Sequence, residues 1–328
     1  MSKRRRGAAF AGAEAGPQPQ ALCRKRKAMV VALAWVTPAN VWRAWSWEPG
    51  IVAPLGLSLG LYAAGALRLG RRLRRGRERR ELQAAAFAAG WGTLFAALVS
   101  PIHELGETLF SVHMLQHELL IMMAAPLLAA SRPGAVMLWA FPAAARAGLG
   151  RLGQRLHSYA SALARPLPCG VLFTFVLWLW HVPALYQAAV RNPALHALEH
   201  ASFFCVAYLF WWMLLPRRRG LSAAAAGWSC LAAAAQTSGL GLWLACSSRP
   251  WYPVYSSRVA LWNLTPLADQ RIGGLLMWIT GGVPLAMLGL LLFLLPGWKP
   301  LRLPETGTES GREAPAIEFD RRTPFQAG

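Results

Sequence analysis

Seven apolar stretches, each close to the length that crosses a lipid bilayer, constrain this chain more than any other feature. A bilayer core needs about 20 mostly apolar residues per spanning helix. Within lipid, only helices and closed barrels satisfy their backbone hydrogen bonds, and continuous apolar runs without alternation favour helices. We therefore predict an all-α bundle of about seven transmembrane helices, over residues 51–69, 84–100, 111–131, 169–190, 194–215, 227–247 and 270–296.

The net charge of +20 would suggest a nucleic-acid partner in a soluble protein. Here the basic residues lie in alternate gaps between apolar stretches: eight Arg fall between Arg68 and Arg80, and Glu81 to Ser131 contains no Lys or Arg. The positive-inside rule makes the basic gaps cytoplasmic. We predict a multi-pass protein of the bacterial inner membrane, with the N-terminal side of the first span outside and the C-terminus cytoplasmic. Its bulk partner is the lipid bilayer, and we expect no nucleic acid.

The chain divides into three parts. Residues 1–50 form a basic N-terminal arm, and its segment 24–39, with four basic residues before a short apolar run, resembles a signal peptide or an uncleaved signal anchor. Residues 51–298 form the membrane domain. The mixed charges of 299–328 indicate a disordered cytoplasmic tail.

Six of the seven histidines fall at the outer side of the membrane in this topology. Two pairs, His113/His117 and His196/His200, have four-residue spacing at the start of predicted spans. Residues at i and i+4 share a helix face, so each pair presents two imidazoles about one turn, ~6 Å, apart. Ionisable groups inside spans are costly and are functional candidates by default.

Imidazole is the commonest metal ligand in proteins. The candidate metal ligands are His113, His117, His181, His196, His200 and Asp269. His181 and Asp269 either complete the site or orient the other ligands, and Asp269 is also suited to capping the helix that "PLADQ" begins. Glu118 and Glu199 have no assigned role, because each is a sequence neighbour of a histidine and so lies on a different face.

Other residues offer weaker signals. Met114, Met122 and Met123 could supply thioethers that favour Cu⁺, although Met in a span is more typical of packing. His103 and His157 are more typical of interfacial residues. The five Cys have no C-x-x-C spacing, which argues against a disulfide framework.

Several membrane-protein classes are excluded or disfavoured. "HMLQH" has the spacing of a zinc protease helix but lacks the Glu of H-E-x-x-H, so we expect no catalytic residues of that kind. Retinal requires a Lys inside a span, and the four Lys, at 3, 25, 27 and 299, all lie outside. A transporter ranks low because the titratable groups cluster near one face instead of crossing the bilayer.

Three motifs in order, "HMLQH", "LWHVPALYQAAVRNPALHALEHASFF" and "DQRIGGLLMW", resemble the CtaG family of caa-type cytochrome c oxidase assembly factors. The resemblance covers Trp45 to Trp298. Its pattern falls on the six candidate ligands and on Gln270. It implies a non-enzymatic, seven-helix protein that partners cytochrome c oxidase subunits and helps to supply copper. The alternative from the residues alone is a membrane oxidoreductase with haem held between two histidines.

Overall fold

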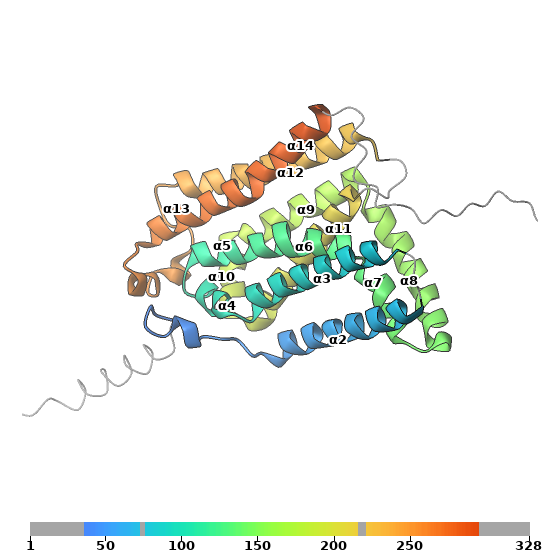
Figure 1. Ribbon diagram of the computed structural model, residues 1–328. Coiled ribbons are helices and arrows are strands. Elements are labelled where there is room, and N and C mark those ends of the chain that lie inside the picture. Colours follow the sequence, from blue (N-terminus) through green and yellow to red (C-terminus); the bar gives the residue numbers. More distant parts are fainter. Residues whose placement is uncertain (1–35, 73–75, 216–220, 295–328) are drawn as a thin grey trace, which may run out of the picture.

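The structure, a computed structural model, describes residues 36–72, 76–215 and 221–294. Within these residues every regular element is a helix (Figure 1). The long ones are α2 (Pro49–Arg72), α3 (Arg77–Leu98), α8 (Ala143–Leu163), α9 (Pro166–His181), α11 (Pro193–Leu214) and α12 (Ala223–Cys246). Two more are continuous but change helix type: α5 (Phe110–Glu118), η2 (Leu119–Ala124) and α6 (Ala125–Ser131), and then α13 (Pro266–Leu276), η6 (Met277–Gly282) and α14 (Val283–Leu294).

Short helices connect the long ones. They are η1 (Val41–Arg43), α4 (Pro101–Gly106), α7 (Pro133–Met137), η3 (Leu138–Ala140), α10 (Pro183–Arg191), η4 (Pro253–Tyr255) and η5 (Val259–Trp262). The signal-like segment 24–39 lies outside the described residues up to position 35, and the tail 299–328 lies outside them altogether.

The seven predicted stretches lie on helices, with 169–190 spanning two of them, and this confirms the all-helical fold for the described residues. Among the described residues, five helices are long and apolar enough to cross a membrane, or six if α8 and α9, which meet at 83°, form one broken span. Of the other predicted spans, α3 begins with a charged turn from Arg77 to Glu81, and α9 has only 16 residues. The count of seven and the sidedness therefore stay predictions.

The predicted helix over 169–190 is interrupted. Helix α9 ends at His181, and α10 begins at Pro183. Val182 between them has an extended backbone, with ψ of 123°, because the ring of a following proline disfavours the helical conformation. The break leaves His181 at the end of a helix.

The helix formed by α5, η2 and α6 lies at the centre of the bundle (Figure 1). In its most apolar 18-residue stretch, 61% of the residues are buried, whereas in that of α2 at the edge 17% are buried. It packs against α3, α11 and α13, and α12 packs along α13 and α14. Side chains on this central helix therefore face protein on most sides.

Helix α8 lies across one end of the bundle (Figure 1). One side of it exposes a row of apolar residues at three- and four-residue spacing: Leu149, Leu152, Leu156, Tyr159 and Leu163. Arginines are interspersed with that row. This pattern is typical of a helix that lies in the membrane interface and does not cross the bilayer.

The opposite end, here called the histidine end, is where α5, α11 and α13 begin and α9 ends. Helices α4 and α10 and the segment 247–265 lie over it (Figure 1). Six of the seven histidines lie at this end, in agreement with their predicted gathering at one face. His157 lies on α8 instead.

Candidate metal centre

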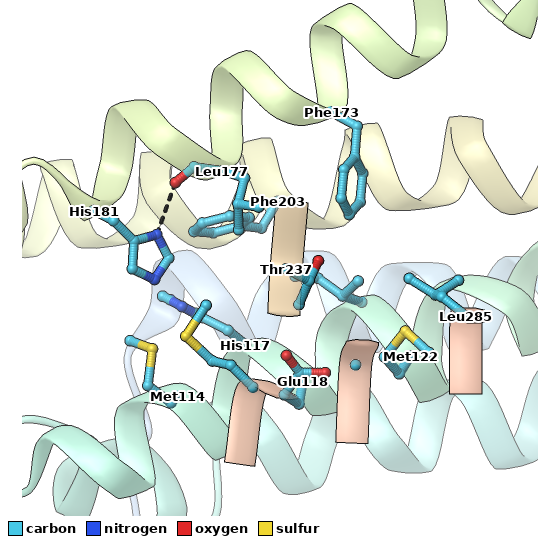
Figure 2. Close-up of a pocket in the computed structure, with 13 residues that line it drawn as sticks. Met114, His117, Glu118, Met122, Phe173, Leu177, His181, Phe203, Thr237 and Leu285 are labelled. Atoms are coloured by element: carbon cyan, nitrogen blue, oxygen red, sulfur yellow. Dashed lines mark hydrogen bonds between the residues drawn. The ribbon is translucent and has the colours of Figure 1, made fainter. Parts of the chain in front are cut away.

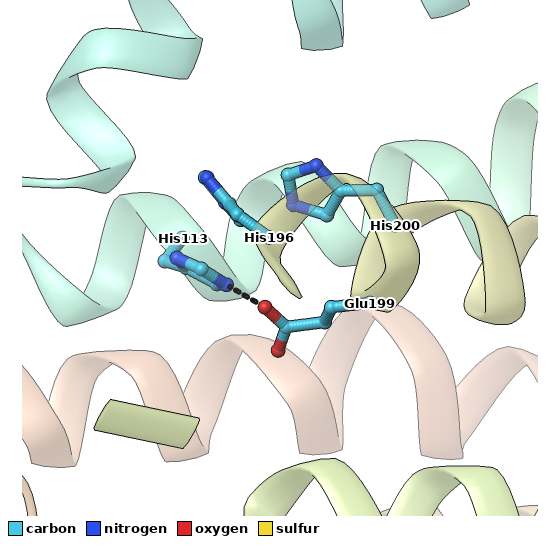
Figure 3. Close-up of side chains that lie close together, drawn as sticks. All are labelled: His113, His196, Glu199 and His200. Atoms are coloured by element: carbon cyan, nitrogen blue, oxygen red, sulfur yellow. Dashed lines mark ion pairs between the residues drawn. The ribbon is translucent and has the colours of Figure 1, made fainter. Parts of the chain in front are cut away.

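Four side chains from two helices meet at the histidine end. His113 on α5 and His196, Glu199 and His200 on α11 each offer a nitrogen or oxygen atom, and these atoms all lie within 4.8 Å of one another (Figure 3). All four residues are buried. We call them the buried cluster. Two ligands of one ion lie at most about 4 Å apart, since each is about 2 Å from the metal. Small side-chain rotations would therefore close the cluster on one ion.

The start of α11 sets the positions of the three residues that this helix adds to the buried cluster. The Asn192 side chain accepts hydrogen bonds from the backbone amides of Ala194, at 2.9 Å, and Leu195, at 3.2 Å, and so caps the helix. Pro193 occupies the first turn, where no amide donor is needed. His196, Glu199 and His200 then follow at i, i+3 and i+4 and share one face.

Glu199 lies between the two histidines of α5. Its Oε2 is 3.5 Å from His113 Nε2, and its Oε1 is 3.6 Å from His117 Nε2. Both distances are longer than a good hydrogen bond. Figure 3 shows the carboxylate pointing at His113. Glu199 is therefore the acidic member of the site, a role that the sequence left unassigned.

His181 faces the cluster from the end of α9. Its Nδ1 lies 2.7 Å from the carbonyl oxygen of Leu177 (Figure 2). A nitrogen facing a carbonyl must carry the proton, so the lone pair is on Nε2. Metal-binding histidines characteristically donate their second nitrogen in this way. The ring centroid lies 6.5 Å from that of His117, so His181 lies beside the buried cluster.

Many buried polar atoms at this place have no hydrogen-bond partner among the described residues. They are His113 Nε2, both ring nitrogens of His117, the Nε2 atoms of His181, His196 and His200, and both carboxylate oxygens of Glu199. Each such atom costs about 1–3 kcal/mol when left unsatisfied. Imidazole and carboxylate lone pairs that converge in this manner fit a bound metal cation.

Asp269 lies at the start of α5. Its carboxylate accepts hydrogen bonds from the backbone amides of Phe110, at 2.6 Å, and Ser111, at 3.1 Å, and from the Ser111 hydroxyl, at 2.5 Å. It therefore caps α5, the helix that carries His113, and not its own helix. Among the candidate ligands, it is the one whose oxygens already have partners.

Gln270 has a comparable structural role. Its Oε1 accepts a hydrogen bond from the Trp251 backbone amide, at 2.6 Å, and its Nε2 donates to the carbonyl oxygen of Leu244, at 3.2 Å. These bonds fasten the segment that follows α12 over the histidine end.

Three tyrosines, from α10 and the segment 247–265, cover the site at the histidine end. The Tyr186 and Tyr255 hydroxyls lie 2.9 Å apart, and Tyr252 donates to the carbonyl oxygen of His181 at 3.0 Å. The Tyr255 hydroxyl donates to the Gly106 carbonyl, at 3.2 Å, and lies 3.4 Å from His113 Nδ1. Burial raises the pKa of Tyr255, so the hydroxyl stays protonated.

A second group of possible ligands lies beside the buried cluster. His103 and Glu107, at α4, together with His196 each offer an atom within 4.8 Å of the others. Burial lowers the pKa of His103 to about 4, so its ring is neutral near pH 7. The sequence predicts neither residue as a metal ligand, because α4 has only six residues and its orientation depends on packing against α5.

Glu118 lies deeper in the bundle. It lines a small cavity, about 10 Å³ and so large enough for about one water molecule, together with His117, His181 and Thr237 (Figure 2). Both Met114 and Met122 also line this cavity, whereas Met123 is 51% exposed and does not line it. Of the three methionines, Met123 is thus the least suited to the metal.

Comparison with known proteins connects this site to a family. The family model described as "Cytochrome c oxidase caa3 assembly factor (Caa3_CtaG)" matches residues 60–295. Uncharacterized protein Mb0105 of Mycobacterium bovis and Uncharacterized protein MT0111 of Mycobacterium tuberculosis are each 28% identical to this chain over 273 residues. Those alignments cover 76% of this chain but 39% of each relative, so the chain spans about two fifths of their length. No solved structure matches significantly.

The region that the family model matches includes the helices from α3 to α14, and with them every histidine, glutamate and aspartate described above as part of the site. The chain belongs to the cytochrome c oxidase caa3 assembly factor family.

Proposed function

We propose that this protein is a membrane assembly factor that binds one copper ion as cargo at the buried cluster and passes it to a subunit of a haem-copper cytochrome c oxidase. The observation that carries the proposal is the convergence of buried imidazole and carboxylate atoms without hydrogen-bond partners. A cation that accepts their lone pairs satisfies them together. Family membership supplies the oxidase as the partner.

The donor set supports a transferable copper ion. Imidazole ligands suit copper, zinc and iron, and divalent copper binds such sites most tightly in the first-row series. The four Cys in the described part of the chain, at 169, 205, 230 and 246, belong to neither ligand group. A site without thiolates holds Cu⁺ by fewer soft ligands, which favours release to an acceptor.

His117 and His181 extend the buried cluster on its deeper side. His117 contacts Glu199 at 3.6 Å, and His181, whose ring lies 6.5 Å from that of His117, has an unpartnered Nε2. We assign both histidines to ligand exchange around the same ion. We assign Asp269 to positioning, because it fixes the start of the helix that carries His113 and His117.

The haem alternative fits the geometry less well. Haem ligation by two histidines places the porphyrin between their rings. Here the rings of His113, His196 and His200 lie 4.3 to 5.7 Å apart between centroids. Imidazoles packed this closely leave no room for a porphyrin plane and favour a bare ion.

Metal content tests the proposal. Full-length protein, purified in detergent and loaded with copper, is compared with a His113→Ala/His117→Ala variant and with His157→Ala, whose ring lies on α8 far from the site. We expect about one copper per chain in wild type and in the His157 variant, and little in the double variant. Equal copper in all three would refute the buried cluster as the site, and a haem absorption band would favour the alternative.

A further inference from the structure

The group formed by His103, Glu107 and His196 differs from the buried cluster in its exposure. The Glu107 side chain is 38% exposed, whereas those of His113 and Glu199 are 0% exposed. Glu107 Oε1 lies 3.9 Å from His196 Nδ1. An ion that arrives from outside the protein thus meets Glu107 before it meets any ligand of the buried cluster.

His196 belongs to both groups, and stacked rings link them. The His103 and His196 rings are 5.2 Å apart between centroids, and the His196 and His113 rings are 5.1 Å apart. The two groups are therefore adjacent, and an ion can pass between them by exchanging His103 and Glu107 for deeper ligands while His196 stays bound. Ligand exchange of this kind never leaves the ion without protein ligands.

A cavity leads to this place. It has a volume of about 310 Å³ and is lined by Glu48, His103, Glu107, His196 and His200 among apolar residues of α2, α3 and α11. Acidic side chains at its mouth attract cations. The net charge of the chain is +20, which repels cations, so these acidic side chains provide a local attraction that the rest of the chain does not.

The Gln116 side chain weakens His103 as a resting ligand. Gln116 Nε2 donates to the carbonyl oxygen of Ala97, at 2.8 Å, and lies 3.0 Å from His103 Nδ1. The donated bond makes His103 Nδ1 an acceptor and puts the proton of the neutral ring on Nε2. A metal bound at Nε2 would shift that proton to Nδ1 and so break the hydrogen bond from Gln116. Such a ligand suits transit better than storage.

Resting on the proposed function, we infer that His103, Glu107 and His196 form an access site, a second metal site at which a copper ion binds before it moves to the buried cluster. Glu107 attracts and first binds the ion, and His196 carries it inward. A residue on the route but outside the final site changes the rates of binding and release together and leaves the affinity unchanged.

Transfer kinetics test the access site. Full-length protein in detergent is mixed with a coloured Cu⁺–chelator complex, and loss of the colour gives both the rate and the end point. We expect Glu107→Gln to slow uptake about tenfold, since steering by charge changes association rates by 10-fold or more. The end point should stay within about threefold of wild type. His103→Ala should also slow uptake.

Glu104→Gln is the matched control. It removes an equal charge from α4, the short helix that Glu107 directly follows, at a residue that does not line the cavity, and it should leave the rate within about twofold of wild type. Glu199→Gln should instead shift the end point toward the chelator by 10-fold or more. Equal rates for the Glu107 and Glu104 variants would overturn the access site, and so would a Glu107 variant that lowers affinity without slowing uptake.

The two proposals fail differently. If wild type takes no Cu⁺ from the chelator, the proposed function falls and the access site with it. If wild type and the Glu107 variant load at one rate while the Glu199 variant does not load, the copper site stands and the access site is wrong.

Discussion

Asp269 on α13 accepts a hydrogen bond from the backbone amide of Phe110, the first residue of α5, at 2.6 Å. The two residues are 159 positions apart in the chain. The first amides of a helix lack partners within it and carry partial positive charge, so a carboxylate there both satisfies and stabilises them. Since His113 follows Phe110 by three residues, this hydrogen bond fixes the position of His113 in the buried cluster.

Replacing Asp269 with Asn should destabilise the protein and loosen the cluster. An amide retains one acceptor and turns an NH₂ group toward donors, so part of the cap is lost. We expect a cost of about 1–3 kcal/mol, measured as a lower midpoint of thermal unfolding in detergent, together with weaker copper binding. Ser111→Ala, which removes only the hydroxyl bond, should have a smaller effect. If the two variants have equal midpoints, the backbone cap carries little of the stability.

Helices α12 and α13 approach each other closely at Gly241 and Gly274. A methyl group on Gly274 would collide with the carbonyl oxygen of Gly241 and with the backbone of Ala245. Backbone atoms cannot move aside as a flexible side chain can, so Gly274→Ala should lower the unfolding midpoint by several degrees, in line with the 1–3 kcal/mol typical of overpacking. Gly239→Ala, which meets nothing within 4 Å, is the control. A midpoint equal to that of the control would mean that the helices separate easily.

Much of this architecture could be predicted because lipid imposes strict conditions on sequence. Each long apolar stretch became a helix, since no other local structure satisfies the backbone in a bilayer. Within "GGLLMWITGG", Gly274 lies at a close contact with the backbone of α12. The predicted span 169–190 is divided at Val182, and Pro183 is the direct cause of the break.

The candidate site was predictable only as far as single helices determine it. The i, i+4 histidine pairs lie on shared faces as expected. Glu199 shares a face with His196 at i+3, a signal that its adjacency to His200 concealed. Asp269 could not be placed in advance, because capping of a distant helix depends on how α13 packs against α5. His103 and Glu107 depend likewise on the packing of a six-residue helix.

His117→Ala should reduce oxidase activity in cells while the protein stays inserted in the membrane. The substitution removes two ring nitrogens that have no hydrogen-bond partner, so it costs little in lost hydrogen bonding and removes a contact to Glu199. The measurements are oxidase activity and copper content in isolated membranes, with immunoblotting of the variant. His157→Ala is the control. Full oxidase activity with the His117 variant as sole copy would exclude His117 from the site.

The Tyr255 hydroxyl determines which nitrogen of His113 is available to a metal. It donates to the Gly106 carbonyl at 3.2 Å, so toward His113 Nδ1, at 3.4 Å, it acts as an acceptor. That arrangement favours a proton on Nδ1 and a lone pair on Nε2, the atom that faces Glu199. Loss of the hydroxyl removes this preference and leaves Nδ1 without its bond.

Tyr255→Phe keeps the aromatic ring and removes only that hydroxyl. Loss of a hydrogen bond behind a metal ligand typically weakens affinity 10- to 100-fold, so we expect copper affinity to fall by about tenfold in competition with a chelator. Uptake from the Cu⁺–chelator complex should begin at the wild-type rate, because the access site is intact. Tyr159→Phe, at an exposed position on α8, is the matched control. An affinity equal to that of the control would show that His113 binds copper without help from Tyr255, or does not bind it.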